Sequence, residues 1–154
     1  MYVCGRGTDG YGTILPALFQ GARMGLVDRI VCCATSKSSI DQLDKKVAGL
    51  AGMFGNSWIE KVYPSEGRDP EAYLKAIDDA ESQGEPFDGA ILAVPDHLHY
   101  DIARRTIECG LHTFLVKPFV TRLEDGVALT RLAREKKVYA AVEFHKRYDH
   151  SNIK

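Results

Sequence analysis

Residues 5–10 read Gly5-Arg6-Gly7-Thr8-Asp9-Gly10, between a short apolar stretch, residues 1–4, and a longer one, residues 11–22. A strand, a glycine-rich turn and a helix in this order are the context in which a GxGxxG pattern is typical of dinucleotide binding. Gly5 would allow the tight turn, Gly7 the approach of a pyrophosphate, and Gly10 the close packing of helix and strand. Taken alone, the pattern fits an ordinary strand–helix turn equally well, so the other strand ends have to decide.

Apolar, β-branched runs alternate with helical periodicity along the whole chain. We expect strands at residues 1–4, 28–34, 58–62, 87–94, 112–116 and 138–144. We expect helices at residues 11–22, 38–53, 69–83, 96–109 and 122–136. This alternation predicts a Rossmann-type α/β fold, a doubly wound parallel sheet of order 3-2-1-4-5-6 in three α/β/α layers.

Single residues predict where these helices begin, bend or end. Ser38 or Ser39 would cap the second helix, and Asp69 the third. Pro16 should interrupt and kink the first helix. Gly110 should end the fourth helix in the left-handed conformation.

The chain has 154 residues, 45% of them hydrophobic and 27% charged, and a formal net charge of −1. These values predict one globular domain with no general attraction to nucleic acid or to an anionic membrane. No apolar run approaches the roughly 20 residues that span a bilayer, and the pattern of a signal peptide is absent. The cysteines lack CxxC spacing, so we expect buried, reduced thiols and a cytoplasmic location. They are Cys4, Cys32, Cys33 and Cys109.

The predicted second strand ends at Thr35, Ser36 and Lys37. NAD-binding domains usually carry Asp or Glu here, which accepts hydrogen bonds from the ribose hydroxyls. Hydroxyls and a lysine instead suit the 2′-phosphate of NADP, which a carboxylate would repel. We therefore expect NADP as the cofactor and NAD as the second choice. A solvated helix start is the simpler alternative.

The predicted fourth strand ends at Val94 and is followed by Pro95, Asp96, His97 and His99. Pro95 turns the chain away from the sheet, and Asp96 can cap the next helix. The HxH pair invites a metal interpretation, but its members share no helix face and no further ligand lies nearby. We therefore expect no metal, and we assign this stretch to capping and cofactor contact.

Lys117 and Pro118 follow the predicted fifth strand, and Glu143 and His145 stand at the end of the sixth. An ammonium at this edge of a parallel sheet can hydrogen-bond a substrate hydroxyl or carbonyl, or the nicotinamide. A lysine that extends to solvent is the alternative. The charged residues after strand six suit a polar site or a docking seam.

Taken together, these strand ends resemble the glucose–fructose oxidoreductase/inositol dehydrogenase (Gfo/Idh/MocA) family of NAD(P)-dependent oxidoreductases. The resemblance covers essentially the whole chain. It is most specific in Val94-Pro95-Asp96-His97-Leu98-His99-Tyr100, Val116-Lys117-Pro118 and His145-Lys146-Arg147-Tyr148-Asp149. These three stretches are similar to that family's P-x-x-x-H turn, its E-K-P signature and its R-[FY]-D stretch.

The resemblance implies hydride transfer between a nicotinamide and a hydroxyl-bearing carbon of a sugar, cyclitol or related polyol. It assigns the catalytic role to Lys117, which would reach both substrate and nicotinamide. Residues 5–10 would bind the pyrophosphate, and residues 35–37 the adenosine ribose. Other cofactor contacts are expected at Val94, Pro95, His97, His99, Pro118, Glu143 and His145.

Two departures from the family pattern qualify this assignment. Val116 stands where the family usually has Glu, and Asp9 places a carboxylate in the phosphate turn. Family members also continue into a second, substrate-binding domain. We therefore expect residues 1–150 to form the NAD(P)-binding domain and residues 151–154 to begin a missing domain. The chain alone would bind cofactor without turnover, and the uncovered flank of strand six would favour a homo-oligomer.

A non-catalytic NAD(P)-binding sensor or assembly module remains an alternative. Assays of cofactor binding and of polyol turnover would separate it from an enzyme. A short-chain dehydrogenase is excluded, because that class needs GxxxGxG and a Tyr-x-x-x-Lys pair. No tyrosine in this chain precedes a lysine by four positions.

Overall fold

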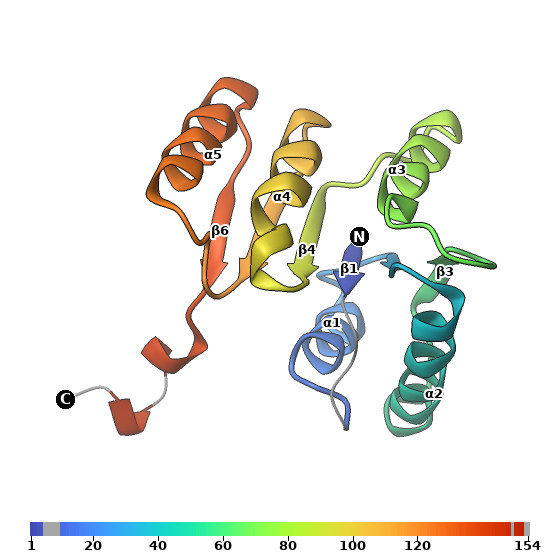
Figure 1. The fold of residues 1–154 in the computed structure, drawn as a ribbon. Helices are drawn as coiled ribbons and strands as arrows, with labels where there is room; N and C mark the ends of the chain where they lie inside the picture. The colour runs from blue at the N-terminus through green and yellow to red at the C-terminus, as the bar shows by residue number, and fades with distance from the viewer. Residues whose placement is uncertain (5–9, 149, 153–154) are drawn as a thin grey trace. The chain divides into compact units, whose positions relative to one another are not determined.

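The computed structural model describes residues 1–4, 10–148 and 150–152. Most of the glycine-rich turn lies outside the described residues, namely Gly5, Arg6, Gly7, Thr8 and Asp9. The chain forms two compact units, Met1–Pro86 and Phe87–Lys154 (Figure 1). Within the described residues, six β-strands and five α-helices alternate, and the paired strands are parallel. This is the Rossmann-type α/β fold that the sequence predicts.

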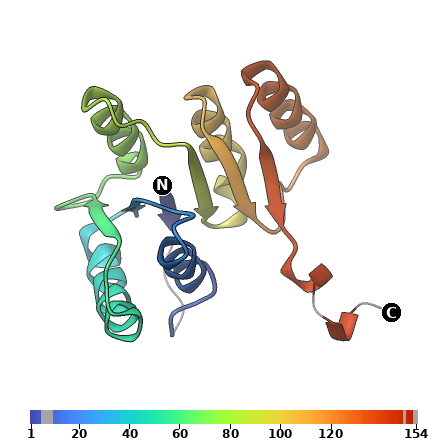
Figure 2. The ribbon, with the colours of Figure 1, turned by 180° about the vertical axis from the view of Figure 1, so that it is seen from behind.

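The first unit contains three strands and three α-helices. Its strands are β1 (Tyr2–Cys4), β2 (Ile30–Cys33) and β3 (Ile59–Tyr63), and its helices are α1 (Ile14–Arg23), α2 (Lys37–Phe54) and α3 (Ala72–Ser82). The strands pair in the order β3-β2-β1, with Tyr2 beside Cys32 and Cys33 beside Tyr63. Figures 1 and 2 show α1 and α2 on one side of these strands and α3 on the other. This order matches the first half of the predicted sheet.

The core of the first unit lies where α1 and α2 cover β2. Phe19 of α1, Ile40 of α2 and Cys32 of β2 are completely buried. The Phe19 ring meets Phe54 and Trp58 edge-on, with centroids 5.7 and 5.6 Å apart. Burial of each large apolar side chain contributes about 1.5–3 kcal/mol, so this packing holds the start of α2 at the end of β2.

Two helices of the first unit begin at different residues from those predicted. α1 begins at Ile14 and runs unbroken through Pro16. The expected interruption is wrong, because a proline in the first turn removes an N–H that has no helical partner there. α2 is capped by Ser36 and not by Ser38 or Ser39, because Ser36 has the extended backbone of a cap and its Oγ accepts a hydrogen bond from Ser39 N.

Neither aspartate expected to cap a helix does so. Asp69 Oδ1 accepts a hydrogen bond from Glu71 N at 2.9 Å, but α3 starts only at Ala72. Asp96 begins a short 3-10 turn, η1 (Asp96–Leu98), and α4 (His99–Glu108) follows without a side-chain cap. In both places a turn is inserted between the aspartate and the helix, which moves the carboxylate away from the helix start.

The second unit contains β4 (Gly89–Ala93), β5 (His112–Val116) and β6 (Ala140–Glu143), with α4 and α5 (Leu123–Lys136). The strands pair in the order β4-β5-β6, the second half of the predicted order. Two 3-10 turns follow β6, η2 (His145–Tyr148) and η3 (His150–Asn152). α4 and α5 pack against each other, and the core includes the buried residues Leu92, Ile107, Leu115 and Leu129.

Gly110 follows α4 with φ 80°, which confirms the predicted left-handed stop. Cys32 and Cys33 are buried, as expected. Cys109 is exposed, so the expectation that it is buried is wrong; it lies at the solvent-facing end of α4. In the part of the chain that the structure describes, no helix is both long and apolar enough to cross a bilayer.

Candidate functional site

The end of β2 carries the three residues expected to bind the adenosine ribose. Thr35 is exposed, and the Ser36 hydroxyl is engaged as the cap of α2. Lys37 Nζ donates a hydrogen bond to the carboxylate of Asp41 and lies 4.0 Å from that of Asp44. The bond to Asp41 raises the pKa of Lys37. The charge of Lys37 is therefore already matched by carboxylates of its own helix.

A second loop, residues 64–71 between β3 and α3, lies against the end of β2. Ser36 forms an isolated antiparallel bridge with Arg68. Two backbone hydrogen bonds flank the bridge, from Lys37 N to Gly67 O (2.9 Å) and from Asp69 N to Thr35 O (3.0 Å). Arg68 is exposed. Arg68 is not marked as a site residue by the sequence, because its only local signal is an arginine inside a Gly-Arg-Asp-Pro turn.

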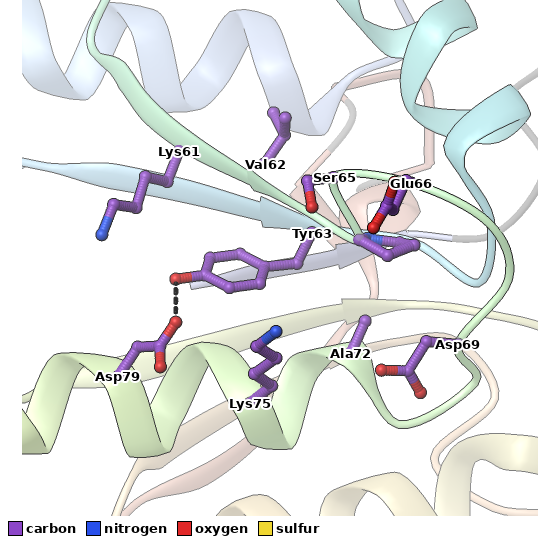
Figure 3. Close-up of a pocket in the computed structure, with 10 residues that line it drawn as sticks. Lys61, Val62, Tyr63, Ser65, Glu66, Asp69, Ala72, Lys75 and Asp79 are labelled. Atoms are coloured by element: carbon purple, nitrogen blue, oxygen red, sulfur yellow. Dashed lines mark hydrogen bonds between the residues drawn. The ribbon is translucent and has the colours of Figure 1, made fainter.

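A cavity of about 460 Å³ lies between β3 and α3 (Figure 3). Inside it, Tyr63 Oη donates a hydrogen bond to Asp79 Oδ2 at 2.8 Å. Burial, followed by this bond, raises the pKa of Tyr63 to about 12, so the hydroxyl keeps its hydrogen at neutral pH. Lys61 and Lys75 also line the cavity. None of its lining residues belongs to the predicted site.

In the second unit, His99 connects the loops that follow β4 and β5. Its side chain is completely buried, with Nε2 3.0 Å from Val94 O and Nδ1 2.7 Å from Pro118 O. Both carbonyl oxygens are acceptors, so a ring nitrogen that carries hydrogen donates to the oxygen it faces. The structure thus brings the P-x-x-x-H turn and the Lys117-Pro118 segment together, with His99 behind the surface.

β4, β5 and β6 lie side by side with their carboxyl ends at one edge (Figure 2). Three predicted site residues are exposed after β4 and β5, namely Pro95, His97 and Lys117. Lys117 forms no ion pair with any residue that the structure describes. Val116 is in register with the half-buried Glu143 on β6, about 4.8 Å away across the sheet. The side chain of His145 lies outside the described residues.

The register of Val116 and Glu143 bears on the departure from the family pattern. Residues in register on parallel strands project to the same face of the sheet. A carboxylate therefore stands on β6 beside the position where the resemblance expects Glu on β5. Sequence spacing alone gave no reason to pair these two positions.

The family model described as "Oxidoreductase family, NAD-binding Rossmann fold" (Gfo/Idh/MocA) matches residues 42–144, more than half of the chain. The chain belongs to this family. The match confirms the resemblance to this family, and it contains two of the three stretches that suggest it, residues 94–100 and 116–118. It includes the ends of β4 and β5 and does not include residues 5–10 or 35–37.

Two curated relatives match part of the chain. An uncharacterized oxidoreductase of Synechocystis is 37% identical over 57 residues, which are 37% of this chain and 15% of that protein. The scyllo-inositol 2-dehydrogenase (NADP⁺) of Bacillus subtilis is 36% identical over 59 residues, which are 38% of this chain and 16% of that protein.

A solved structure shows the same fold over nearly the whole chain. The WlbA dehydrogenase of Thermus thermophilus, in complex with NAD and UDP-GlcNAcA, matches 98% of this chain and 44% of its own with a TM-score of 0.66. The sequence identity is 20%, so this likeness shows the fold alone. The chain thus spans less than half the length of these relatives. The individual roles assigned to Lys117 and to the cofactor-contacting residues stay predictions.

Proposed function

We propose that this chain is the NAD(P)-binding domain of an oxidoreductase that transfers hydride to or from a hydroxyl-bearing carbon of a sugar, cyclitol or related polyol. Membership of the family supports a nicotinamide cofactor. The observation that carries the proposal is the exposed Lys117, next to a loop that His99 ties to the turn after β4. In this arrangement a cation stands at the carboxyl edge of the strands, where parallel sheets bind their ligands.

Lys117 is suited to act on the substrate oxygen. Its ammonium is exposed, and no carboxylate among the described residues is paired with it. From Nζ it would donate a hydrogen bond to the hydroxyl or carbonyl oxygen, stabilise negative charge there, and exchange a proton with it. The bound nicotinamide supplies or accepts the hydride. His99 would position this lysine indirectly by holding the Pro118 carbonyl.

The donor groups near β2 support NADP as the cofactor, with NAD as the second choice. Two hydroxyls and one lysine stand at residues 35–37, and an arginine, Arg68, lies beside Ser36 in the 64–71 loop. Such groups suit a phosphate better than the free ribose hydroxyls, which carboxylates usually bind. One relative is named for NADP, whereas the WlbA structure contains NAD.

The same proposal bears on the substrate-binding domain, the cellular compartment and the association of copies of this chain. The substrate would be held by a second domain, so the chain alone is expected to bind cofactor without turnover. The buried thiols Cys32 and Cys33 support a reducing compartment, the cytoplasm. Tyr139 directly precedes β6 and Phe144 directly follows it, and both side chains are exposed. Their exposure supports association of copies of the chain along β6.

A non-catalytic NAD(P)-binding sensor or assembly module is the second candidate. Val116 favours it, because the carboxylate that the family usually places next to the lysine is not on β5. Both candidates share the cofactor site, so cofactor binding supports either of them. Turnover separates them.

The proposal is tested by cofactor titration followed by a turnover assay. NADPH and NADH are titrated into the wild-type chain and Lys117→Met, with nicotinamide fluorescence as the readout. Both chains, joined to the substrate domain of a family member, are then assayed with NADP⁺ and a panel of polyols. Lys61→Met, at an exposed lysine on β3, is the matched control and is taken through both the titration and the turnover assay.

We expect saturable binding by all three chains, and turnover that falls about 10²–10⁴-fold only in Lys117→Met, because that variant loses its proton donor. Failure of both dinucleotides to bind would overturn the proposal. Binding that persists without turnover in the joined protein would favour the sensor or assembly module.

A further inference from the structure

The bridge between the end of β2 and the 64–71 loop determines on which face the side chain of Arg68 leaves the backbone. Lys37 N donates to Gly67 O, and Asp69 N donates to Thr35 O, on the two sides of the Ser36–Arg68 pair. This pattern makes Ser36 and Arg68 a non-hydrogen-bonded antiparallel pair, the kind with the shorter Cα separation of about 4.5 Å. Paired side chains leave the backbone on the same face, so Arg68 projects beside the Ser36 side chain.

The neighbouring acidic residue of the loop lies on the opposite face. Successive side chains of an extended segment alternate between faces, which separates Asp69 from Arg68. Two observations agree with this: Asp69 lines the cavity between β3 and α3 (Figure 3), and its carboxylate accepts the hydrogen bond from Glu71 N. The carboxylate next to Arg68 in sequence is therefore directed away from the end of β2.

Among the residues that the structure describes, Lys37 and Arg68 are the cations at the end of β2, and they differ in the groups that already bind them. Lys37 is held by Asp41 and lies close to Asp44. Arg68 is exposed and has no ion-pair partner among the described residues. A phosphate would have to displace the carboxylates from Lys37, whereas it would meet Arg68 without competition. A guanidinium also binds phosphate through two parallel N–H bonds, which an ammonium does not offer.

We propose that Arg68, and not Lys37, binds the 2′-phosphate of NADP and thereby sets the preference of this chain for NADP over NAD. The inference rests on the proposed cofactor-binding function, in which the ribose of the adenosine lies at the end of β2. It adds a specificity-determining residue from a different loop, the one between β3 and α3. It also assigns to Arg68 the phosphate-binding role that the sequence suggests for Lys37.

Dissociation constants of NADP⁺ and NAD⁺ for four chains test this assignment: wild type, Arg68→Gln, Lys37→Gln and Arg23→Gln. Arg23 is the matched control, an exposed arginine at the end of α1, which lies at the amino edge of the strands. Isothermal titration and thermal melting are measured for each chain. Because Arg68 is exposed, the melting temperature of Arg68→Gln is expected to equal that of the wild type, which excludes a folding defect.

We expect Arg68→Gln to weaken NADP⁺ about 10- to 100-fold, the usual worth of hydrogen bonds to a charged group, and to change NAD⁺ less than about twofold. Lys37→Gln should weaken NADP⁺ no more than about threefold, and Arg23→Gln should change neither constant. A second variant, Ser36→Asp, keeps a good helix cap but offers Arg68 a carboxylate, and it should lower the NADP⁺ preference as well.

Three results would overturn the inference while leaving the proposed function intact. They are a wild type without NADP preference, an Arg68→Gln variant that weakens both dinucleotides equally or neither, and a loss of NADP⁺ affinity found in Lys37→Gln instead. Binding of neither dinucleotide to the wild type would overturn the proposed function, and this inference with it.

Discussion

The loops at the strand ends are held together differently in the two units. In the second unit, the completely buried ring of His99 lies between the loops after β4 and β5. In the first, backbone hydrogen bonds join the loops after β2 and β3, and Lys37 and Arg68 around them reach solvent. Breaking a buried hydrogen bond lowers the free energy of unfolding several times more than breaking an exposed polar contact does. The edge that carries Lys117 is therefore locked by packing, whereas the end of β2 can change its charges at little cost in stability.

The largest effect is expected from His99→Ala. The substitution leaves a cavity and removes the ring N–H that donates to a backbone carbonyl, so unfolding should need about 3 kcal/mol less free energy. His97→Ala is the matched control, because His97 belongs to the same HxH pair but is exposed. Its cost should stay below about 0.5 kcal/mol. Urea unfolding measures both, and equal costs would remove the contrast between the two units.

A smaller effect is expected at the end of β2. Ser36→Ala removes the hydroxyl that caps α2 and should cost about 1 kcal/mol. Ser38→Ala, in the first turn of the same helix, should cost almost nothing, because the Ser38 hydroxyl bonds only the Ser36 hydroxyl in the described structure. Thermal melting of both variants checks this. A larger loss in Ser38→Ala would assign the cap to Ser38, one of the two serines that the sequence suggests.

The smallest effect is expected in the cavity beside β3. Tyr63→Phe removes the hydrogen bond to Asp79 and should cost about 0.5–1 kcal/mol at neutral pH. The folded pKa of Tyr63, about 12, lies above its ordinary value of 10.0. Burial, followed by this bond, raises the pKa, so the stabilisation that depends on the neutral hydroxyl is complete below pH 10 and is lost as the pH rises from 10 to 12. Unfolding titrations across this range should show the difference between wild type and variant shrinking; a constant difference would contradict the assignment.

Much of the fold could be read from local pattern. β5 occupies the residues predicted for it, and Gly110 ends α4 as expected, because strand periodicity and a left-handed stop depend on near neighbours. The helix starts were less predictable. Ser36, Ser38 and Ser39 all stand within four residues of Ile40, and only the backbone conformation decides that Ser36 is the cap. Pro16 was misinterpreted for a related reason, since its effect depends on where α1 begins.

The candidate site also contains residues that local sequence features mark and residues that they do not mark. Lys117 was found because an exposed cation after an apolar strand is a local feature that the family stretches also mark. Arg68 was missed, because its importance comes from a bridge to a residue in another loop. The burial of His99 was not foreseen either, since no spacing in the sequence shows that the loop after β5 covers it.

The sequence by itself determined the alternation of strands and helices, the parallel order within each unit and the family of the protein. These properties depend on periodicity and on short motifs, whose residues act on neighbours a few positions away. Tertiary structure alone decided that Arg68 lies beside Ser36, that Glu143 is in register with Val116, and that His99 is enclosed between two loops. Each of these pairs joins segments far apart in the chain, and strand register and side-chain packing bring them into contact.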